Sequence, residues 1–423
     1  MKIIVGHSKC GGTIDLPASK SYMHRAIIAS CLAKGESIIK NITLSEDIDA
    51  TIDAFKVLGA DIKEENDTLI IKGIKDFNSA LNSEIDCNNS GSTLRFLIPI
   101  LSLFNISFTL RGSKSLFSRP LDVYKDIYNK EGLKFDLCEN YLDVSGRLRA
   151  NEYVLKGNIS SQFISGLLFV LPLLEGDSII KIIPPLESES YINMTIKVLK
   201  DYGIEIIRES RYEFFIKGNQ EYKSREYYIE KDFSQFAFFG VLGAINNGIT
   251  CKGLNINSLQ GDRFIIDILR AFNVKVDVNG DEVVVHKCNN IQGCNIDLKD
   301  CPDLGPILMV LSLFSKNKVC INNINRLRIK ESNRVESMVD NLRKLNAKID
   351  VSDNELVIYP SKIKRSREIL ESYNDHRVMM AMVVLATCIR GYTIIDNPLC
   401  VKKSYVNFYR DMQRIGADIG LHD

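Results

Sequence analysis

Basic residues recur at the starts of predicted helices, where the helix dipole opposes them. Lys20, Arg334 and Arg377 each stand beside polar residues and just ahead of an amphipathic or apolar helical run. A helix N-terminus carries partial positive charge and free N–H donors, so it attracts anions and repels cations. A repeated electrostatic penalty of this kind indicates phosphate and carboxylate ligands. The other cations in or near such turns are Arg25, Lys402 and Lys403.

Three further residues near helix starts could move protons: Asp303 in PDLGP, Glu331 in KESNR and His376 in NDHR. Carboxyl and imidazole groups act as general acids and bases when they are held beside a reacting atom. Each residue also has a purely structural alternative. Asp303 could cap its helix, Glu331 could pair with Lys330, and His376 could be a hydrogen-bonded residue of the interior. Spacing alone does not separate these alternatives, so they stay open at this point.

Composition excludes several classes of protein. A length of 423 residues predicts two or three domains, and a net charge of +1 provides no field for nucleic acid or an anionic membrane. The longest apolar stretches fall short of the roughly 18 to 20 residues that cross a bilayer. The eleven cysteines lack zinc-ligand spacing, and neither a P-loop nor a G-x-G-x-x-G motif occurs. We therefore expect reduced thiols in a cytoplasmic protein, with no bound metal.

A sixfold repeat organises the chain. A Gly or Asn that ends an amphipathic segment recurs every 70 to 73 residues, at Gly59, Gly132, Gly203, Asn273, Asn346 and Gly416. Two alternating apolar runs follow the marker in most copies, which predicts a helix and then a hairpin. Upstream in every copy lies a more uniformly apolar helix followed by a strand. We expect these buried helices to begin near Tyr22, Ser92, Ser161, Ser234, Gly305 and His376.

The sixth copy lacks the final strand of its hairpin, whereas the strand at residues 2–5 has no copy of its own. The economical prediction is that this N-terminal strand completes the sixth unit, because an uncovered edge strand invites aggregation. Three units per half then predict two similar domains. One covers residues 14–226, and the other covers 1–13 together with 227–423.

At these residues the chain resembles the enolpyruvyl transferase family, and within it the branch that acts on shikimate 3-phosphate. The resemblance covers the whole chain. It rests on PASKSYMHRA from Pro17, NNSGSTLRFL from Asn88, SRP from Ser118, SSQF from Ser160, PD at Pro302, LRIKESNR from Leu327, YNDHR from Tyr373, and Lys403. The fold it implies is of α/β class: two domains, each of three βαβαββ units with pseudo-threefold symmetry, joined by two crossovers.

The resemblance implies transfer of the enolpyruvyl group of phosphoenolpyruvate to the 5-hydroxyl of shikimate 3-phosphate, with release of phosphate and without any cofactor or metal. The residues implied for shikimate 3-phosphate are Lys20, Ser21, Arg25, Ser160, Ser161, Gln162, Ser188, Tyr191, Asp303 and Lys330. Those implied for phosphoenolpyruvate are Lys20, Gly91, Arg119, Gln162, Arg334, Arg377 and Lys403. The hydroxyl must lose a proton while the methylene carbon gains one. Asp303 is the candidate base, Glu331 the candidate acid, and Lys20 assists phosphate departure.

Some residues depart from the family pattern. Ala18 stands where Gly is common, Ser92 where Thr is frequent, and Phe96 where some members have Pro. The run at residues 232–236 replaces small residues, and Arg326 stands where some members have a substrate-binding Asn. The fine shape of the phosphoenolpyruvate pocket, and with it sensitivity to the inhibitor glyphosate, is therefore left open.

Two other functions are alternatives to enolpyruvyl transfer to shikimate 3-phosphate. The sister branch that acts on UDP-N-acetylglucosamine typically has Lys-Asn at Lys20-Ser21 and a cysteine in the loop before Arg119, and neither occurs here. A non-catalytic anion-binding relative would be expected to have lost a catalytic group, whereas Lys20, Asp303, Glu331 and Lys403 are all present. We therefore expect an active enzyme that works as a monomer on two small anionic substrates, with no nucleic-acid or membrane partner.

Overall fold

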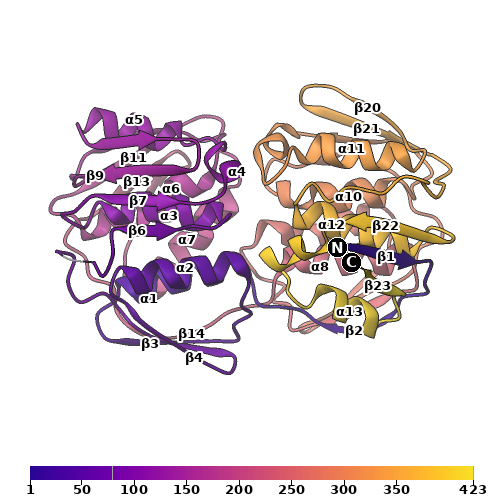
Figure 1. The fold of residues 1–423 in the computed structure, drawn as a ribbon, viewed down its shortest axis with the longest axis horizontal. Helices are drawn as coiled ribbons and strands as arrows, with labels where there is room; N and C mark the ends of the chain where they lie inside the picture. Colours follow the sequence, from indigo (N-terminus) through magenta and orange to yellow (C-terminus); the bar gives the residue numbers. More distant parts are fainter. Residues whose placement is uncertain (79, 423) are drawn as a thin grey trace. The chain divides into compact units, whose positions relative to one another are not determined.

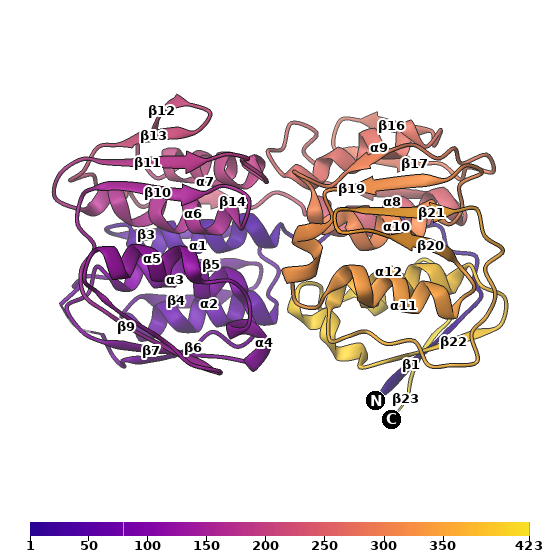
Figure 2. The ribbon, with the colours of Figure 1, turned by 90° about the horizontal axis from the view of Figure 1, so that it is seen from above.

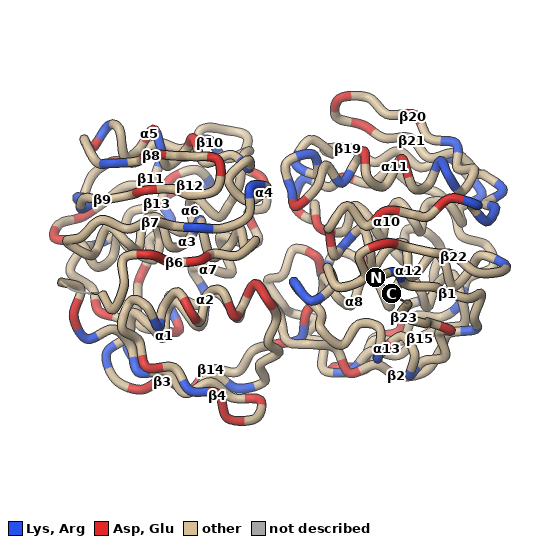
Figure 3. The backbone as a smooth tube through the Cα atoms, viewed as in Figure 1, with Lys and Arg blue, Asp and Glu red and all other residues tan. Residues whose placement is uncertain are grey.

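The computed structural model describes residues 1–78 and 80–422, and its internal contacts divide the chain into two compact units. The N-unit is Ala18–Glu230, and the C-unit is Met1–Pro17 together with Lys231–Asp423. Each unit is described by itself. Both are mixed α/β structures in which sheets surround buried helices, as Figures 1 and 2 show. Lys and Arg are interspersed with Asp and Glu along both units (Figure 3), in keeping with a net charge of +1.

The N-unit contains three four-stranded sheets. Its strands are β3 (Glu36–Lys40), β4 (Asp61–Glu65), β5 (Thr68–Lys72), β6 (Glu84–Asp86), β7 (Phe108–Arg111), β8 (Lys134–Leu137), β9 (Tyr141–Ser145), β10 (Glu152–Lys156), β11 (Ser178–Ile183), β12 (Ile207–Ser210), β13 (Glu213–Ile216) and β14 (Glu226–Tyr228). The sheet orders are β14-β3-β5-β4, β6-β7-β9-β8 and β10-β11-β13-β12. In each sheet the first pair is parallel and the others are antiparallel. The parallel pair requires a crossover, which a buried helix supplies in the second and third sheets.

The helices of the N-unit fall into two groups. The buried ones are α1 (Lys20–Leu32), α3 (Gly91–Leu101) and α6 (Ser161–Val170), and nearly all their residues are buried. The helices that keep one face toward solvent are α2 (Glu46–Val57), α5 (Asp122–Lys130) and α7 (Glu189–Asp201). Two short segments are α4 (Lys114–Phe117) and η1 (Leu171–Leu173). The uniformly apolar sequence of the first group accounts for its burial on all sides.

The C-unit repeats this plan. Its strands are β1 (Lys2–Gly6), β2 (Gly12–Asp15), β15 (Ile249–Lys252), β16 (Val276–Asn279), β17 (Glu282–Val285), β18 (Ile296–Asp297), β19 (Val319–Asn322), β20 (Lys348–Val351), β21 (Glu355–Tyr359), β22 (Tyr392–Asp396) and β23 (Ile419–His422). They form the sheets β16-β17-β15-β2, β18-β19-β21-β20 and β22-β1-β23. Its α-helices are α8 (Phe233–Ile245), α9 (Ile265–Ala271), α10 (Gly305–Ser312), α11 (Arg334–Lys344), α12 (His376–Thr387) and α13 (Phe408–Arg414). The 3-10 helices are η2 (Gly261–Phe264), η3 (Pro302–Leu304), η4 (Asn325–Ile329) and η5 (Pro398–Lys403). The fully buried helices α8, α10 and α12 contact one another at its centre.

The chain crosses between the two units directly after β2 and directly after β14. Strand β2 precedes α1 in the sequence, but it pairs in parallel with β15 of the C-unit. Strand β14 precedes α8, but it pairs in parallel with β3 of the N-unit. The chain therefore completes β2 in the C-unit before it enters the N-unit, and it completes β14 in the N-unit before it returns to the C-unit. The register of these two pairs sets the limits of the units at residues 17/18 and 230/231.

The third sheet of the C-unit is built around the N-terminal strand. Strand β1 lies between β22 and β23 and is antiparallel to both. Ile3 pairs with Ile395 on one side and Leu421 on the other. The position that the parallel first strand occupies in the other five sheets is reduced here to a single bridge between Leu370 and Ile395.

The starts of the six buried helices confirm the repeat. They begin at Lys20, Gly91, Ser161, Phe233, Gly305 and His376, within two residues of the predicted positions. All six repeat markers, including Gly59 and Asn346, have positive φ angles. A left-handed residue at the end of a helix satisfies its last carbonyl groups, and Gly and Asn adopt that conformation most readily. The period of 70 to 73 residues is thus the spacing of helix C-caps.

One placement was wrong. Lys402 and Lys403 were expected near the first turn of the last helix, whereas they end η5, and α13 begins only at Phe408. Pro398 opens η5 and pre-sets the backbone angle for a tight first turn. The two lysines therefore lie where the helix dipole favours cations, and they carry no penalty from it.

Alternation along β1 yields a stability prediction. Ile3 is fully buried, whereas its neighbour Ile4 on the opposite face is only partly buried. Ile3→Ala is expected to lower the free energy of unfolding of the C-unit by about 2–4 kcal/mol, because it opens a cavity in the core. Ile4→Ala is the matched control and should cost less than about 1 kcal/mol. Denaturant unfolding of both variants measures the difference, and equal losses would contradict this placement of the strand.

Candidate active site

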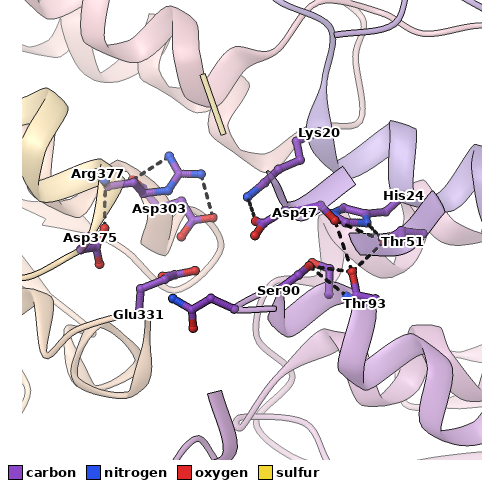
Figure 4. Close-up of polar contacts among 12 residues, drawn as sticks. Lys20, His24, Asp47, Thr51, Ser90, Thr93, Asp303, Glu331, Asp375 and Arg377 are labelled. Atoms are coloured by element: carbon purple, nitrogen blue, oxygen red, sulfur yellow. Dashed lines mark hydrogen bonds and ion pairs between the residues drawn. The ribbon is translucent and has the colours of Figure 1, made fainter. Parts of the chain in front are cut away.

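The first helix of the N-unit begins with a lysine that forms an ion pair. The ammonium group of Lys20 contacts the carboxylate of Asp47, which lies in the first turn of α2 (Figure 4). Both side chains are largely enclosed, with 18% and 12% of their surfaces exposed. Asp47 suits its place because a helix N-terminus favours an anion. The penalty that Lys20 meets at the start of α1 is thereby offset within the N-unit.

Arg25 lies one turn further along α1 and is 3% exposed. Its Nε donates to Thr195 Oγ1 at 2.7 Å, and its Nη groups donate to the carbonyl oxygens of Ser21 and Tyr191 at 2.7 and 3.2 Å. The guanidinium carbon also lies 5.9 Å from the centre of the Tyr191 ring. Burial lowers the pKa of Arg25 to about 10, and the part of the chain that the structure describes supplies it with no carboxylate partner. Its positive charge is therefore held by neutral groups and suits an incoming anion.

The start of α3 brings two arginines to a glycine. A Cβ atom at Gly91 would lie 2.8 Å from Nη1 of Arg119 and 3.4 Å from Nη1 of Arg95. Nη2 of Arg119 donates to Asn89 Oδ1 at 3.2 Å. Ser90 caps the helix by accepting from the backbone N–H of Thr93 at 3.3 Å. The absence of a side chain at Gly91 thus lets the guanidinium of Arg119 approach the N-terminus of the helix.

The starts of α6 and α7 supply polar groups of the same kind. Ser160 caps α6, accepting from the N–H of Gln162 at 3.3 Å. The Gln162 amide is oriented at both ends, since its oxygen accepts from Arg95 at 2.9 Å and its nitrogen donates to Ser92 at 2.8 Å. Ser161 is buried beside this cap. Ser188 is fully buried and adopts a left-handed conformation ahead of α7, with φ of 52°.

In the C-unit the buried guanidinium of Arg334 joins three carboxylates. It is 1% exposed, and its Nε donates to Asp375 Oδ2 at 2.8 Å. Nη1 donates to Asp303 Oδ1 at 2.8 Å, and Nη2 donates to Glu331 Oε2 at 2.5 Å. Burial opposes its charge, but Asp375, Glu331 and Asp303 outweigh that effect and raise the pKa of Arg334. The two candidate proton-transfer groups, Asp303 and Glu331, are therefore oriented by one side chain.

Asp303 receives two further cations. Lys330 Nζ lies 3.2 Å from its Oδ1, and Arg377 Nη2 lies 3.2 Å from its Oδ2. Burial alone would raise the pKa of the Asp303 carboxyl, but Arg377, Lys330 and Arg334 together hold it well below its usual value. Burial also lowers the pKa of Lys330, against the opposing effect of Asp303. Asp303 is thus ionised in this structure.

The start of α12 places Arg377 beside Asp303. Asp375 caps this helix and accepts from the backbone N–H of Arg377 at 2.9 Å (Figure 4). It also accepts from Ser332 Oγ at 3.1 Å. Lys403, at the end of η5, donates to the carbonyl oxygen of Asn374 at 2.5 Å. The NDHR sequence therefore positions two cations. Its helix cap, Asp375, holds Arg377, and the backbone carbonyl of Asn374 holds Lys403.

A fourth carboxylate of the C-unit, that of Asp262, is in a different state. It lies in η2, is 1% exposed and accepts a short hydrogen bond from Ser234 through Oδ2. Its Oδ1 has no hydrogen-bond partner among the described residues. Burial, and then the charge of Asp303, raise the pKa of Asp262 to about 7, although Arg377 opposes this. Asp262 is therefore the carboxylate of this group that binds a proton near neutral pH.

Within each unit the structure gathers the residues that the motifs single out. Sequence reasoning missed several of their partners: Asp47, Thr195, Ser332 and Asp262. Asp47 and Ser332 stand near helix starts, where acidic and hydroxyl residues are ordinary caps, so no signal set them apart. Asp262 lies in the sequence QGDR at residues 260–263, and nothing in this sequence marks it as a neighbour of Asp303. Its proximity to Asp303 depends on how the units of the repeat pack.

Comparison with known proteins decides the family. The model of the EPSP synthase (3-phosphoshikimate 1-carboxyvinyltransferase) family matches residues 4–412. The chain belongs to the EPSP synthase family. A 3-phosphoshikimate 1-carboxyvinyltransferase of Clostridium perfringens is 42% identical over 418 residues, which are 98% of each chain. One of Clostridioides difficile is 42% identical over 424 residues, 97% of each chain. The family identified from the motifs is confirmed.

Solved structures agree on the fold. An EPSP synthase of Acinetobacter baumannii superposes with a TM-score of 0.81 at 21% identity and covers 100% of both chains. The enolpyruvyl transferase NikO of Streptomyces tendae gives a TM-score of 0.81 at 18% identity, covering 99% of this chain and 98% of its own. The predicted α/β class and enolpyruvyl transferase fold are thereby confirmed.

The described residues of this EPSP synthase family member contain neither a membrane-spanning helix nor a metal-binding cluster. Over residues 1–78 and 80–422, no helix is long and apolar enough to cross a membrane. The same residues contain no group of three or more His, Cys, Asp or Glu side chains arranged to hold a metal ion.

The protonation of Asp262 makes the stability of the C-unit depend on pH. Because its folded pKa is raised to about 7 from an ordinary 3.8, the folded state binds one more proton than the unfolded state between these values. This group therefore lowers the free energy of unfolding by about 1.4 kcal/mol per pH unit as pH rises from about 4 to 7. The isosteric variant Asp262→Asn has no titratable group at this position, so its free energy of unfolding does not fall with pH for this reason.

Denaturant unfolding from pH 4 to 8 tests the effect. The stability of Asp262→Asn relative to the original protein should rise with pH up to about 7 and then level off. Asp300→Asn, at an exposed position, is the control and should show a flat difference. A flat difference for Asp262→Asn as well would show that Asp262 titrates normally.

Proposed function

We propose that this protein transfers the enolpyruvyl group of phosphoenolpyruvate to the 5-hydroxyl of shikimate 3-phosphate and releases phosphate. The match to the EPSP synthase family over nearly the whole chain supports this reaction. One structural observation carries the chemistry. Asp303 and Glu331, the two groups with the chemistry for the proton transfers, are both hydrogen-bonded to the buried Arg334. An acid and a base held by one rigid planar group have a fixed separation, as a two-proton reaction requires.

Both substrates are anions, and helix N-termini with adjacent cations bind them. We assign shikimate 3-phosphate to Lys20, Ser21, Arg25, Ser160, Ser161, Gln162, Ser188, Tyr191, Asp303 and Lys330. We assign phosphoenolpyruvate to Lys20, Gly91, Arg119, Gln162, Arg334, Arg377 and Lys403. The support is that most of these groups lie at or beside helix starts, and that hydrogen bonds or ion pairs orient the side chains of Lys20, Arg25, Gln162, Arg334 and Arg377, so few rotamers are lost on binding.

Substrate binding turns Asp303 into a base. In the structure described here its pKa is held far below neutrality by Arg377, Lys330 and Arg334, and such a carboxylate is a poor proton acceptor. The anionic substrates compete for Arg377 and Lys330. As these cations turn to phosphate and carboxylate groups, the pKa of Asp303 rises toward the operating pH, where a general base is most effective. Base strength is thus coupled to the presence of both substrates.

The remaining steps follow from atom balance. Asp303 takes the proton of the 5-hydroxyl as its oxygen adds to C2 of phosphoenolpyruvate, and Glu331 supplies a proton to C3, which gives a tetrahedral intermediate. Glu331 then recovers a proton from the methyl group as the bond between C2 and the phosphate oxygen breaks. The proton held by Asp303 passes to the departing phosphate, which restores both carboxyl groups to their starting states. Lys20 assists departure by neutralising the leaving group. Preorganised cations stabilise the charge that develops in each transition state.

The compartment and assembly state are part of the proposal. All eleven cysteines are free thiols, and Cys138 is exposed. Unpaired thiols suit a reducing compartment, which supports a cytoplasmic enzyme. We propose that it acts as a monomer. Sedimentation of the reduced protein would measure a mass near 47.8 kDa, and a mass of twice that value would contradict a monomer.

Phosphate release tests the proposed reaction. The purified protein is expected to release phosphate when both substrates are present and none with either alone. Replacing shikimate 3-phosphate by UDP-N-acetylglucosamine should give no release. Turnover with that nucleotide sugar, or phosphate release from phosphoenolpyruvate alone, would contradict the assignment.

Removal of the base gives a sharper prediction. Asp303→Asn is expected to reduce kcat by about 10² or more while each KM stays within an order of magnitude, because the amide keeps the size of the side chain but accepts no proton. Asp300→Asn is the matched control, three residues away and exposed. Steady-state kinetics separate the two parameters. Wild-type turnover in Asp303→Asn would remove Asp303 from the mechanism.

A further inference from the structure

A continuous chain of four polar side chains crosses the interior of the N-unit. It runs from His24 on α1 through Thr51 on α2 to Thr93 and Ser90 at the start of α3 (Figure 4). Its links are His24 Nδ1 to Thr51 Oγ1 at 2.8 Å, Thr51 Oγ1 to Thr93 Oγ1 at 2.7 Å, and Thr93 Oγ1 to Ser90 Oγ at 2.7 Å. None of the four residues is more than 1% exposed. Because these polar groups are buried away from water, they must form their hydrogen bonds with one another.

Counting protons fixes the direction of the chain. The Thr93 hydroxyl has one proton and two acceptors, Ser90 Oγ at 2.7 Å and the carbonyl oxygen of Asp47 at 3.3 Å. With the proton in the shorter contact, Thr93 must accept from Thr51. Thr51 has then used its own proton and must accept from His24. The imidazole is neutral, since burial and the charges of Lys20 and Arg25 lower its pKa well below the usual value. Its one ring proton therefore lies on Nδ1. Nε2 is a buried acceptor without a partner among the described residues.

The chain joins the N-terminal ends of three helices. Ser90 is the cap of α3, and Thr93 also donates its backbone N–H to that cap. The hydroxyls of Thr93 and Thr51 lie 3.3 and 3.4 Å from the carbonyl oxygen of Asp47. Asp47 in turn holds the ammonium group of Lys20. Rotation of one hydroxyl would therefore disturb both the cap of α3 and the residue that orients Lys20.

We propose that Ser90, Thr93, Thr51 and His24 are positioning residues, which hold Asp47 and the N-terminal turn of α3 so that Lys20 is correctly placed for enolpyruvyl transfer. This rests on the proposed function, because Lys20 is one of its catalytic residues. We assign no substrate contact to the four side chains. They act through the hydrogen bonds that fix Asp47 and the helix cap.

Steady-state kinetics of isosteric variants test the proposal. Thr93→Val keeps the shape and removes the hydroxyl, so kcat is expected to fall about tenfold, the equivalent of about one lost hydrogen bond, while each KM changes less than threefold. Thr93→Ser restores the hydroxyl and should recover at least half of the original kcat. Thr387→Val is the matched control and should retain kcat: Thr387 is a fully buried helical threonine of the C-unit, and its hydroxyl donates to the carbonyl oxygen of Val384 and accepts from Asn246 Nδ2.

A double variant shows whether the side chains act as one chain. Thr51→Val should also lower kcat about tenfold, and Thr51→Val/Thr93→Val should lose little more than either single variant, since one break already uncouples the chain. Full additivity of the two effects would overturn the proposal. Unchanged kcat in both single variants of an otherwise active protein would overturn it too, and would leave the proposed reaction intact. If the original protein shows no turnover, the proposed reaction itself is contradicted.

The proton on His24 supplies an independent readout. Nitrogen NMR of the histidine-labelled protein is expected to show a neutral ring protonated at Nδ1 and not at Nε2. In Thr51→Val the acceptor for this proton is gone, and the Nδ1 signal should shift, whereas Thr387→Val should leave it unchanged. A ring protonated at Nε2 in the original protein would reverse the chain and overturn the proposal.

Discussion

The buried guanidinium group of Arg334 is met by three carboxylates, and this arrangement governs the C-unit. Arg334 is 1% exposed. Transferring such an ion from water costs several kcal/mol unless it is paired and hydrogen-bonded. Its planar fork accepts partners only in fixed directions. Asp375, Asp303 and Glu331 occupy those directions, and three helix starts are thereby brought to one point.

Opposite charges surround Arg334. Arg334, Arg377 and Lys330 contact Asp375, Asp303 and Glu331. Asp262 forms none of these ion pairs; burial first, and then the charge of Asp303, raise its pKa to about 7. The cations of this cluster can bind new anions only if they release the carboxylates that they contact in this structure. In the proposed reaction the substrates' phosphate and carboxylate groups would do this, which would tie the state of the carboxylates to the state of binding.

The sequence predicted the fold well because the fold repeats. Six copies of one pattern gave the buried helices to within two residues, since helix C-caps and apolar runs are local signals. It also singled out the cations at helix starts, because a residue that opposes the dipole is conspicuous. It could not identify Asp47 as the partner of Lys20, or Asp262 as a neighbour of Asp303. Such pairs join helices distant in the chain, and their acidic members resemble ordinary caps. The position of Lys403 was missed for a related reason, because a 3-10 helix gives little periodic signal.

The placement of β1 between β22 and β23 has a consequence for how the chain matures on the ribosome. Residues 18–230 of the N-unit are contiguous, so they emerge together and have all their partners early in translation. Strand β1 is made long before its neighbours β22 and β23, which lie at residues 392–396 and 419–422. It must wait, with its hydrogen-bonding edges unfilled, until residues 419–422 are released. The C-unit therefore closes only after these residues have been made, and until then the unpaired edges of β1 are where chaperones or misassembly would act first.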